Sequence, residues 1–226
     1  MKKGIFYDEK HKIHIFFYSS DTNNMNIKNI SRKLIISALF TVTSLLIFSC
    51  KTIPHAPQEL SRSIMSQGKL NAKQLAAFFL SRNSDADKKH ITQFAQYYIN
   101  EAAAEGINSD VAFAQMCLET GFLKFGGLVQ PEFHNYCGLG AMDADHPGEQ
   151  FETEELGVRA HIQHLHAYAT TEDIKLHKEL VDPRYNWVHK TKYIEDIFGL
   201  TGTWAADPHY GEKIDGLLTA MENFSR

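Results

Sequence analysis

Glu119 is the residue whose type and position most clearly predict chemistry in this chain. It follows a mainly apolar run, Val111 to Leu118, and Gly121 comes two positions later. A carboxylate at the end of a buried helix is costly to keep ionised, so its pKa is expected to rise. A carboxyl group that stays protonated near neutral pH is suited to act as a general acid. The alternative is a solvated acid at a helix end, since Glu is seldom buried without a partner.

Several helices must position this carboxyl group. Asn108 or Ser109-Asp110 is suited to cap the Glu119 helix, because a short polar side chain accepts a hydrogen bond from a first-turn amide. Apolar residues at helical spacing predict an amphipathic helix before it. Gly-rich and Pro-rich sequence between residues 121 and 150 predicts an irregular segment after it. The expected helices are 71–81, 87–105, 154–169 and one following Pro208, with weaker helical pieces at 58–67, 174–180 and 190–198.

Three histidines in one predicted helix raise the question of a metal site. His161, His164 and His166 lie in the sequence HIQHLH. His161 and His164 share a helix face, but no acidic ligand follows the zincin spacing, and His166 points elsewhere. The sequence therefore favours a solvated or core-edge histidine cluster, and it predicts neither a metal nor another cofactor.

The charge distribution excludes one class of partner. The chain has 226 residues and a formal charge of -4, and residues 1–49 hold seven Lys/Arg against three Asp/Glu. The remaining residues hold sixteen and twenty-four, which is a balance of -8. Phosphate binding needs a basic face, so the acidic body argues against nucleic acid as a partner.

The N-terminal residues resemble an export signal. Arg32-Lys33 precedes a 15-residue apolar run, Leu34 to Phe48, which is shorter than the roughly 20 residues of a membrane-spanning helix. The run fits the core of a secretory signal peptide. Ser49-Cys50 then resembles the lipobox of bacterial lipoproteins, in which the cysteine is acylated and begins the mature chain. The alternatives are an ordinary signal peptide or an uncleaved anchor.

Residues 1–49 are therefore predicted to be a leader with a lipoprotein signal peptide. A chain starting at Met25 would have a short basic lead of the usual kind, so residues 1–24 are interpreted as a start-site artefact. Residues 50–58, with two prolines, are predicted to form an extended tether. The expected location is the cell envelope, with the exported protein held on a membrane by lipid.

The residues around Glu119 resemble the sequence signature of a known family. The run AQMCLETGF, residues 114–122, resembles the signature of bacterial peptidoglycan endo-β-N-acetylglucosaminidases, glycoside hydrolase family 73. In that family an Ala-Gln-x-x-Leu-Glu-Ser/Thr-Gly-aromatic run holds the catalytic acid, which corresponds to Glu119. The family often continues Gly-x-Ser, whereas this chain has Leu123-Lys124-Phe125.

Two later segments follow the family's order. HNYCGLG, residues 134–140, resembles the Asn-Leu-Phe-Gly-Ile-Lys signature, with Gly140 in place of Lys. TWAADPHYG, residues 203–211, resembles Tyr-Ala-Thr-Asp-Pro-x-Tyr, which makes Tyr210 an expected cleft residue. The aromatic residues Tyr185, Trp187 and Trp204 are candidates to stack on sugar rings, with core packing as the equal alternative. The expected substrate-binding residues are Gln115, Asn135, Tyr136 and Gly138 from the resemblance, together with Trp204.

The resemblance implies a fold and a reaction. The fold is expected to be mainly α, a lysozyme-like helical domain with a small irregular or β-hairpin lobe at 127–152. The expected glucosaminidase domain is 87–226, preceded by accessory helices at 59–86. The expected reaction cleaves the β-1,4 bond after N-acetylglucosamine in peptidoglycan, with Glu119 protonating the leaving oxygen. Either Glu149 or Glu152 activates water, or the substrate's own N-acetyl group attacks the anomeric carbon.

Two other functions fit the same residues. One is a lytic transglycosylase or muramidase, which would cut the other glycosidic bond. The other is a non-catalytic wall-binding lipoprotein, which the altered residues Leu123, Phe125 and Gly140 keep open.

Cys117 and Cys137 are a candidate disulfide pair. One lies in the Glu119 helix and the other in the second signature. Export would place both in an oxidising compartment, where a bridge would tie the loop to the helix. Two buried free thiols are the equal alternative, because Cys is often simply a core residue.

Overall fold

The computed structural model describes residues 2–7, 13–18, 59–171 and 173–224. The chain divides into two compact units, Met1–Pro54 and His55–Arg226. In the first unit, β1 (Lys2–Tyr7) and β2 (Ile13–Tyr18) form an antiparallel hairpin in which Lys2 pairs with Tyr18. Every residue with an expected role in catalysis or substrate binding lies in the second unit.

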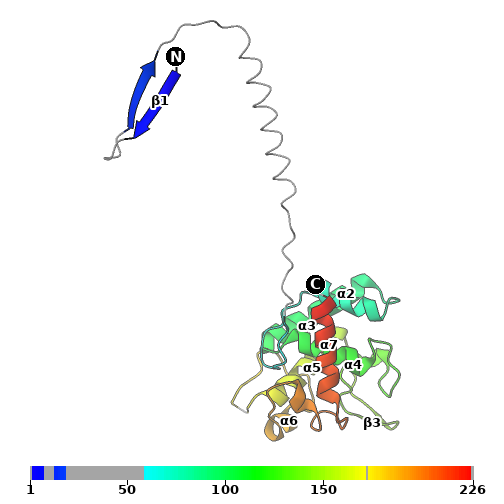
Figure 1. The fold of residues 1–226 in the computed structure, drawn as a ribbon. Coiled ribbons are helices and arrows are strands. Elements are labelled where there is room, and N and C mark those ends of the chain that lie inside the picture. Colours follow the sequence, from blue (N-terminus) through cyan, green and yellow to red (C-terminus); the bar gives the residue numbers. More distant parts are fainter. Residues whose placement is uncertain (1, 8–12, 19–58, 172, 225–226) are drawn as a thin grey trace. The chain divides into compact units, whose positions relative to one another are not determined.

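The second unit is mainly α-helical, as the sequence predicts (Figure 1). Its short elements are the 3-10 turns η1 and η2 and a two-stranded hairpin of β3 and β4. This architecture agrees with a lysozyme-like domain. The described helices are α2 (Ala72–Arg82), α3 (Lys88–Glu105), α4 (Ser109–Thr120), α5 (Glu154–Ala169), α6 (Tyr185–Thr191) and α7 (Tyr210–Phe224), and the short elements are η1 (Pro131–Phe133), β3 (Ala141–Asp143), β4 (His146–Pro147) and η2 (Ile197–Leu200).

Capping residues set the helix boundaries that the sequence predicts. The side chains of Asn71, Asp87, Asn108 and Thr153 each accept a hydrogen bond from a backbone amide in the first turn of α2, α3, α4 and α5. Gly121 ends α4 with φ +58°, a left-handed conformation that glycine adopts without steric cost. The Glu119 helix therefore ends at Thr120, one residue after the carboxylate.

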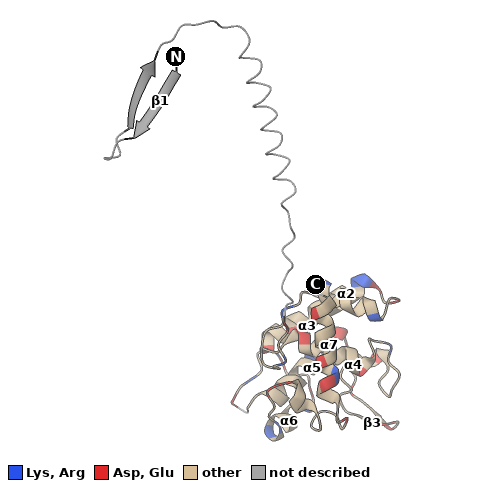
Figure 2. Ribbon diagram, viewed as in Figure 1, with Lys and Arg blue, Asp and Glu red and all other residues tan. Residues whose placement is uncertain are grey.

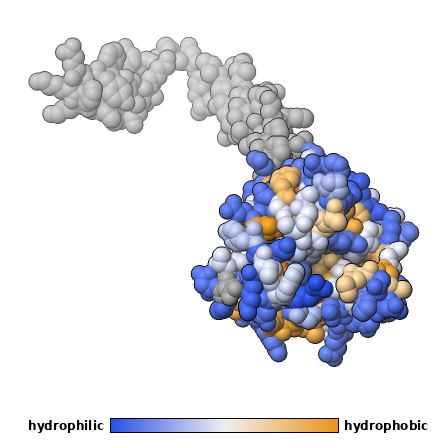
Figure 3. All heavy atoms as spheres, turned by 90° about the horizontal axis from the view of Figure 1, so that it is seen from below, coloured by the Kyte–Doolittle hydropathy of each residue, from blue (hydrophilic) through white to orange (hydrophobic). Residues whose placement is uncertain are grey.

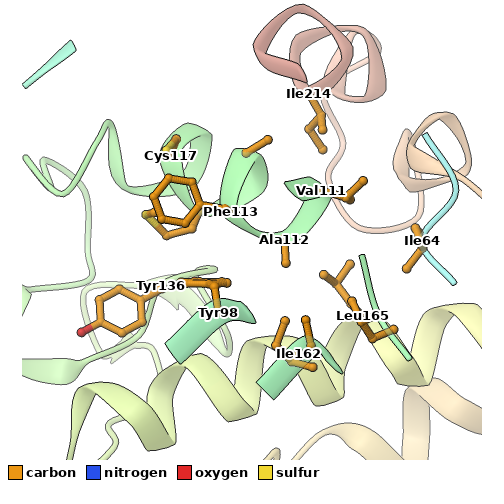
Figure 4. Packing of buried hydrophobic residues seen from close by; sticks show 14 of the residues in the cluster. Ile64, Tyr98, Val111, Ala112, Phe113, Cys117, Tyr136, Ile162, Leu165 and Ile214 are labelled. Atoms are coloured by element: carbon orange, nitrogen blue, oxygen red, sulfur yellow. The ribbon is translucent and has the colours of Figure 1, made fainter. Parts of the chain in front are cut away.

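Helix α4 lies in the middle of the core, which explains why it is apolar on every side. Its residues from Ser109 to Cys117 are all buried. Figure 4 shows Val111, Ala112 and Phe113 of α4 among side chains of neighbouring helices, including Ile162 on α5 and Ile214 on α7. Burial of α4 fixes the direction in which its last turn presents Glu119.

A small lobe follows α4, as expected for residues 127–152. It contains η1 and the antiparallel pair β3–β4, and the rest has no regular structure. Phe122, Leu123 and Phe125 have positive φ angles, so the chain turns sharply as it leaves α4. The Thr120 hydroxyl accepts a hydrogen bond from the Leu123 amide at 2.9 Å and holds that turn.

The segment before α2 differs from its prediction. Residues 59–70 form no helix, and Ser63 instead makes a β-bridge with Asp196. Arg62 forms ion pairs with Asp215 and Glu222 of α7, and Leu60 and Ile64 are buried in the main core. Side-chain anchoring therefore outweighs weak helical propensity here, and residues 59–86 belong to the same compact unit as the main domain.

Two other helical predictions are wrong. No helix covers 174–180, and the piece expected at 190–198 is replaced by α6 and η2. Helix α6 starts at Tyr185, five residues before the predicted start at Lys190, because the side chains of Tyr185 and Val188 pack in the core. Asp196 then caps η2 by accepting hydrogen bonds from Phe198 and Gly199.

The described helices include none that is long and apolar enough to cross a membrane. Apolar residues are scattered among hydrophilic ones on the face seen in Figure 3. The predicted signal core at Leu34–Phe48, Cys50 and the tether at 50–58 lie outside the described residues.

Candidate active site

Glu119 lies between two hollows at the C-terminal end of α4. The larger hollow has a volume of about 520 Å³ and extends toward α6, and the smaller, about 190 Å³, runs along residues 125–129. Glu119, Gly138 and Ala141 line both. The two hollows together form the cleft, and a chain-like substrate laid along it would pass the carboxyl group of Glu119.

The carboxyl group of Glu119 is exposed to solvent on the cleft side and surrounded by protein on the other side. The residue as a whole is exposed, and its side chain forms part of the cleft wall. The surrounding protein nevertheless raises the pKa of Glu119 above that of an ordinary Glu, while hydrogen bonds from Tyr210 and the Trp204 side chain oppose the rise. The expected direction of the shift is present, although the site is an open cleft and not the edge of a dry core.

Tyr210, at the start of α7, is the direct partner of Glu119. Its hydroxyl donates to Glu119 Oε1 and accepts a hydrogen bond from Gln115 Nε2 at 2.9 Å. Burial and the neighbouring carboxylate raise the pKa of Tyr210 well above its usual value, so the phenol keeps its proton. Tyr210 is itself buried and lines neither hollow, so it contacts Glu119 from behind the cleft wall instead of lining the cleft as the resemblance implies. Gln115, expected to bind substrate, is fully buried behind Tyr210.

Two buried residues continue this contact into the core. His161 Nε2 lies 3.0 Å from Gln115 Oε1, and His161 Nδ1 lies 3.0 Å from the Tyr98 hydroxyl. Both side chains are fully buried, and burial lowers the pKa of His161 to about 3. His161 is consequently a neutral hydrogen-bonding residue. The solvated interpretation of the three histidines is wrong, since all are buried, but His164 does lie at the edge of the core, where it lines the larger hollow.

His164 brings a second polar group to the cleft. Its Nδ1 lies 2.7 Å from Oδ2 of the buried Asp182, and the residue lines the larger hollow. Among the described residues, every buried side-chain nitrogen or oxygen has a hydrogen-bond partner. His164 Nε2 has no such partner in that part of the chain, so this nitrogen is not buried and is accessible to solvent. A neutral ring that donates Nδ1–H to Asp182 presents the Nε2 lone pair to a ligand.

Aromatic and basic residues complete the larger hollow. Trp204 lines it and packs edge-on against His164 at a ring distance of 4.9 Å. Trp187 of α6 is 59 % exposed at the same hollow, flanked by Arg184 and Lys192. Figure 2 shows ribbon in the blue of Lys and Arg at α6. Of the residues proposed to stack on sugars, Trp204 and Trp187 reach the cleft, whereas Tyr185 is buried against His166.

The side chains of Asn135 and Tyr136 make contacts within the protein that hold the signature loop in place. Asn135 is 1 % exposed, and its amide group donates to the Leu139 and Glu149 carbonyls. Its Oδ1 accepts from the amides of Cys137 and Leu139, so the side chain organises the signature loop. Tyr136 is buried against Phe94 at a ring distance of 4.7 Å. Of this segment's expected binding residues, Gly138 lines both hollows at the centre of the cleft, and Asn135 lines the smaller one while its amide group holds the loop.

Glu149 and Glu152, the carboxylates expected to activate water, do not join Glu119. Neither residue lines the hollows that meet at Glu119. Glu149 lies against Gly140 and pairs its backbone with Leu139 within the lobe, and Glu152 is exposed. Glu119 is the one carboxylate among the described residues that line the cleft.

The expected disulfide is not formed. Cys117 and Cys137 are both buried and free. Cys117 lies in the main core, while Cys137 packs in a separate small cluster with Leu139 and Ala160. Burial raises the pKa of both thiols, so neither is activated as a thiolate. Among the described residues no group of His, Cys, Asp and Glu is arranged to hold a metal ion.

Sequence reasoning missed Tyr98, His164 and Asp182 as parts of the site. Tyr98 reads as a core position of the α3 helix, and its hydroxyl gives no local signal of a partner 63 residues away. His164 and Asp182 are 18 residues apart, with no recognisable spacing. The histidine-rich pattern of α5 was the available signal, since buried imidazoles need hydrogen-bond partners.

Comparisons with known proteins agree with this site. A family model described as mannosyl-glycoprotein endo-beta-N-acetylglucosaminidase, the glucosaminidase domain, matches residues 95–223. An uncharacterized protein from Borreliella burgdorferi is 40% identical over 162 residues, which cover 72% of this chain and 78% of the relative. No solved structure matches the chain.

Proposed function

Since the chain belongs to the glucosaminidase family of glycoside hydrolases, we propose that it cleaves the β-1,4 bond after N-acetylglucosamine in peptidoglycan. The observation that carries the proposal is the place of Glu119, a carboxyl with a raised pKa between two hollows of one cleft. Space on both sides suits a glycan strand that continues beyond the scissile bond in each direction.

Glu119 is proposed as the general acid. Tyr210 donates to Oε1, which leaves Oε2 to carry the acidic proton. A methyl group placed on Gly138 would lie 3.9 Å from Oε2, so this oxygen faces the Gly138 wall of the cleft. As the glycosidic bond breaks, Oε2 gives its proton to the leaving oxygen, which otherwise would depart as an alkoxide.

The substrate's acetamido group is proposed as the nucleophile. The absence of Glu149 and Glu152 from the described cleft lining favours it over a second carboxylate. The acetamido oxygen bonds to the anomeric carbon as the leaving oxygen takes the proton, and water later opens this ring while Glu119 takes a proton from it. His164 Nε2 is a suitable acceptor for the acetamido N–H. The product then keeps the β configuration, which ¹H NMR of fresh digests reports.

The basic end of the cleft fits an anionic glycopeptide. Arg184, Trp187 and Lys192 line the larger hollow together with Glu119. Among the described residues neither Arg184 nor Lys192 has an ion-pair partner within 4.0 Å. Peptidoglycan strands carry peptide stems with free carboxylates, so these cations are suited to bind a stem beside the sugar that Trp187 contacts.

Product analysis tests the proposed bond. Purified peptidoglycan is digested with the protein, and the new chain ends are reduced and identified by mass spectrometry. The proposal predicts reduced N-acetylglucosamine ends. Reduced N-acetylmuramic acid ends would indicate a muramidase, anhydro-muramic ends a lytic transglycosylase, and no new ends a wall-binding protein.

The protein is proposed to act from a membrane surface in the cell envelope. This rests on the basic, apolar and Ser49-Cys50 segments of the sequence, which come in the order of a lipoprotein signal. A tether after Cys50 would then hold the hydrolase near the wall.

A further inference from the structure

We infer that Tyr98 and His161 are positioning residues that fix Tyr210 as a hydrogen-bond donor to Glu119, through a buried chain of hydrogen bonds with one direction. The chain runs Tyr98, His161, Gln115, Tyr210, Glu119, with heavy-atom distances of 3.0, 3.0 and 2.9 Å for its first three links. It joins four helices, α3, α5, α4 and α7, and ends on the proposed acid. The catalytic meaning of this inference rests on the proposed function, but the direction of the chain does not.

The direction follows from the number of protons each group can give. A phenol has one proton, and Tyr210 gives its proton to the carboxylate, so its oxygen must accept from Gln115. The amide nitrogen of Gln115 therefore faces Tyr210, and its oxygen faces His161. His161 must then carry its proton on Nε2, which leaves Nδ1 to accept from the Tyr98 hydroxyl.

Burial keeps the chain from reversing. Tyr98, Gln115 and His161 are 0 % exposed, and no buried side-chain nitrogen or oxygen in the described part lacks a partner. Water therefore does not replace a link, and reversing one group would leave two donors or two acceptors facing each other, which is costly in a low-dielectric interior. The aromatic contact of Tyr98 with His161, at 5.7 Å and 85°, further holds the imidazole plane.

The functional consequence concerns the two oxygens of Glu119. With Oε1 permanently occupied by a donor, a proton on the carboxyl is placed on Oε2, toward the cleft. If Tyr210 were free to turn its proton away, the carboxyl could instead donate to Tyr210, and the proton would point into the protein. Other titratable groups around Glu119 are Cys137 of the loop, which burial keeps protonated, and the His164–Asp182 pair.

The resting protein gives the first test. In ¹⁵N-labelled full-length protein at neutral pH, the imidazole nitrogens of His161 should show the neutral tautomer with the proton on Nε2. A proton on Nδ1, or on both nitrogens, would overturn the inference. This measurement needs no substrate, so it is independent of whether peptidoglycan is cleaved.

The second test removes the hydroxyl of Tyr98, the donor at the start of the hydrogen-bond chain. Tyr98→Phe deletes the hydroxyl that pairs with His161 Nδ1 and helps to hold the imidazole proton on Nε2, so the His161 spectrum should show a mixture of tautomers. Gln115 and Tyr210 can then reverse, and the pKa of Glu119, followed by ¹³C NMR of its carboxyl, should rise by about half a pH unit. In an active enzyme the alkaline limb of kcat/KM should move upward by the same amount.

Tyr185→Phe is the matched control. It removes a buried hydroxyl that lies 2.9 Å from His166 Nδ1 on the same helix α5, outside the chain. It should cost similar stability and leave both the His161 tautomer and the Glu119 titration unchanged. An unchanged Glu119 titration in Tyr98→Phe, or an equal shift in Tyr185→Phe, would contradict the inference. Should Tyr98→Phe not fold, Gln115→Met breaks the chain next to Tyr210, and an unmoved Glu119 titration there contradicts it equally.

Discussion

At the scale of single residues, the site is determined by what surrounds one carboxyl group. Burial on one side raises the pKa of Glu119, and hydrogen bonds from Tyr210 and Trp204 moderate the rise. The identity of Glu119 as a cleft residue was predictable, because the letters from Ala114 to Phe122 resemble a known catalytic run. The contacts behind it were not, because Tyr98 and His161 are joined to the site only by the packing of α3 and α5.

Tyr210→Phe tests the role of the direct partner. Losing a hydrogen bond to a charged group typically costs about 1.5–3 kcal/mol, and the loss here falls on the ionised form of Glu119. The folded-state pKa of Glu119 should therefore rise further. Since a general acid works only when protonated, the alkaline limb of the pH–kcat/KM profile should move to higher pH, while the rate at low pH falls because the carboxyl is less well oriented.

The pH–kcat/KM profile of the unaltered protein is the reference against which the shift in Tyr210→Phe is measured. Activity should fall as pH rises through the raised pKa of Glu119. Activity that instead increased steadily from pH 5 to pH 8 would mean that the essential carboxyl acts as a base. A downward shift of the limb in Tyr210→Phe would contradict the donor role of Tyr210.

At the scale of elements, helices were predicted correctly where the sequence has both a capping residue and regular apolar spacing, and wrongly where this pattern is weak. The caps at Asn71, Asp87 and Thr153 and the apolar spacing of α3 and α5 predicted these helices closely. The weak pattern at 58–67 failed because Arg62 and Leu60 anchor an extended segment to α7, a long-range contact that sequence spacing does not reveal. The hydrogen bonds of Asn135 were equally hidden from the sequence, since its amide group organises the signature loop while the residue lines the smaller hollow.

Arg184 and Lys192, the two residues that flank helix α6, should decide the preference for peptide-bearing strands. Arg184→Gln with Lys192→Gln removes two cationic side chains from the larger hollow. The double variant should lose several-fold in kcat/KM on intact peptidoglycan but little on strands whose stems an amidase has removed, because only the former offer carboxylates. Digestion of both substrates at low and high salt measures the effect.

Lys88→Gln with Lys89→Gln provides the matched control for charge. These lysines line a separate hollow with Asp87 and Tyr97 at the start of α3. The control should reduce activity on the two substrates equally or not at all. If it lowers the preference for stem-bearing strands as much as the α6 variant does, the cleft cations have no specific role.

At the scale of the whole molecule, one helical unit carries the reaction, and the N-terminal sequence is proposed to place it. The described residues confirm the mainly α class and the small lobe but do not include Cys50. Residues on both sides of residue 87 share one core, to which Leu60, Ile64 and residues of α2 contribute. Separate accessory helices could not be told from core helices by periodicity, since both bury one apolar face.

Cys50→Ala tests the proposed anchor. Each buried methylene of an acyl chain adds about 0.8 kcal/mol of membrane affinity, so two or three chains hold a protein firmly. The parent protein should fractionate with membranes and incorporate labelled fatty acid, and the variant should do neither. A variant that stays in the membrane fraction after a salt wash would show that Cys50 is not the point of attachment.

The central claim is that Glu119 is the general acid of a peptidoglycan hydrolase, and one substitution tests it most directly. Glu119→Gln keeps the side-chain shape and an oxygen that can accept from Tyr210, but it removes the acidic proton. The measurement is the release of soluble fragments from purified peptidoglycan, with co-sedimentation on the same material as the check on folding and binding.

The account predicts that Glu119→Gln still binds peptidoglycan while hydrolysis falls by a factor of about 100 to 10,000, the usual range for general acid catalysis. Glu149→Gln and Glu152→Gln, the same change at the two lobe carboxylates, should remain close to the parent rate. Digestion by Glu119→Gln at nearly the parent rate, or loss of activity in Glu149→Gln or Glu152→Gln instead, would contradict the assignment.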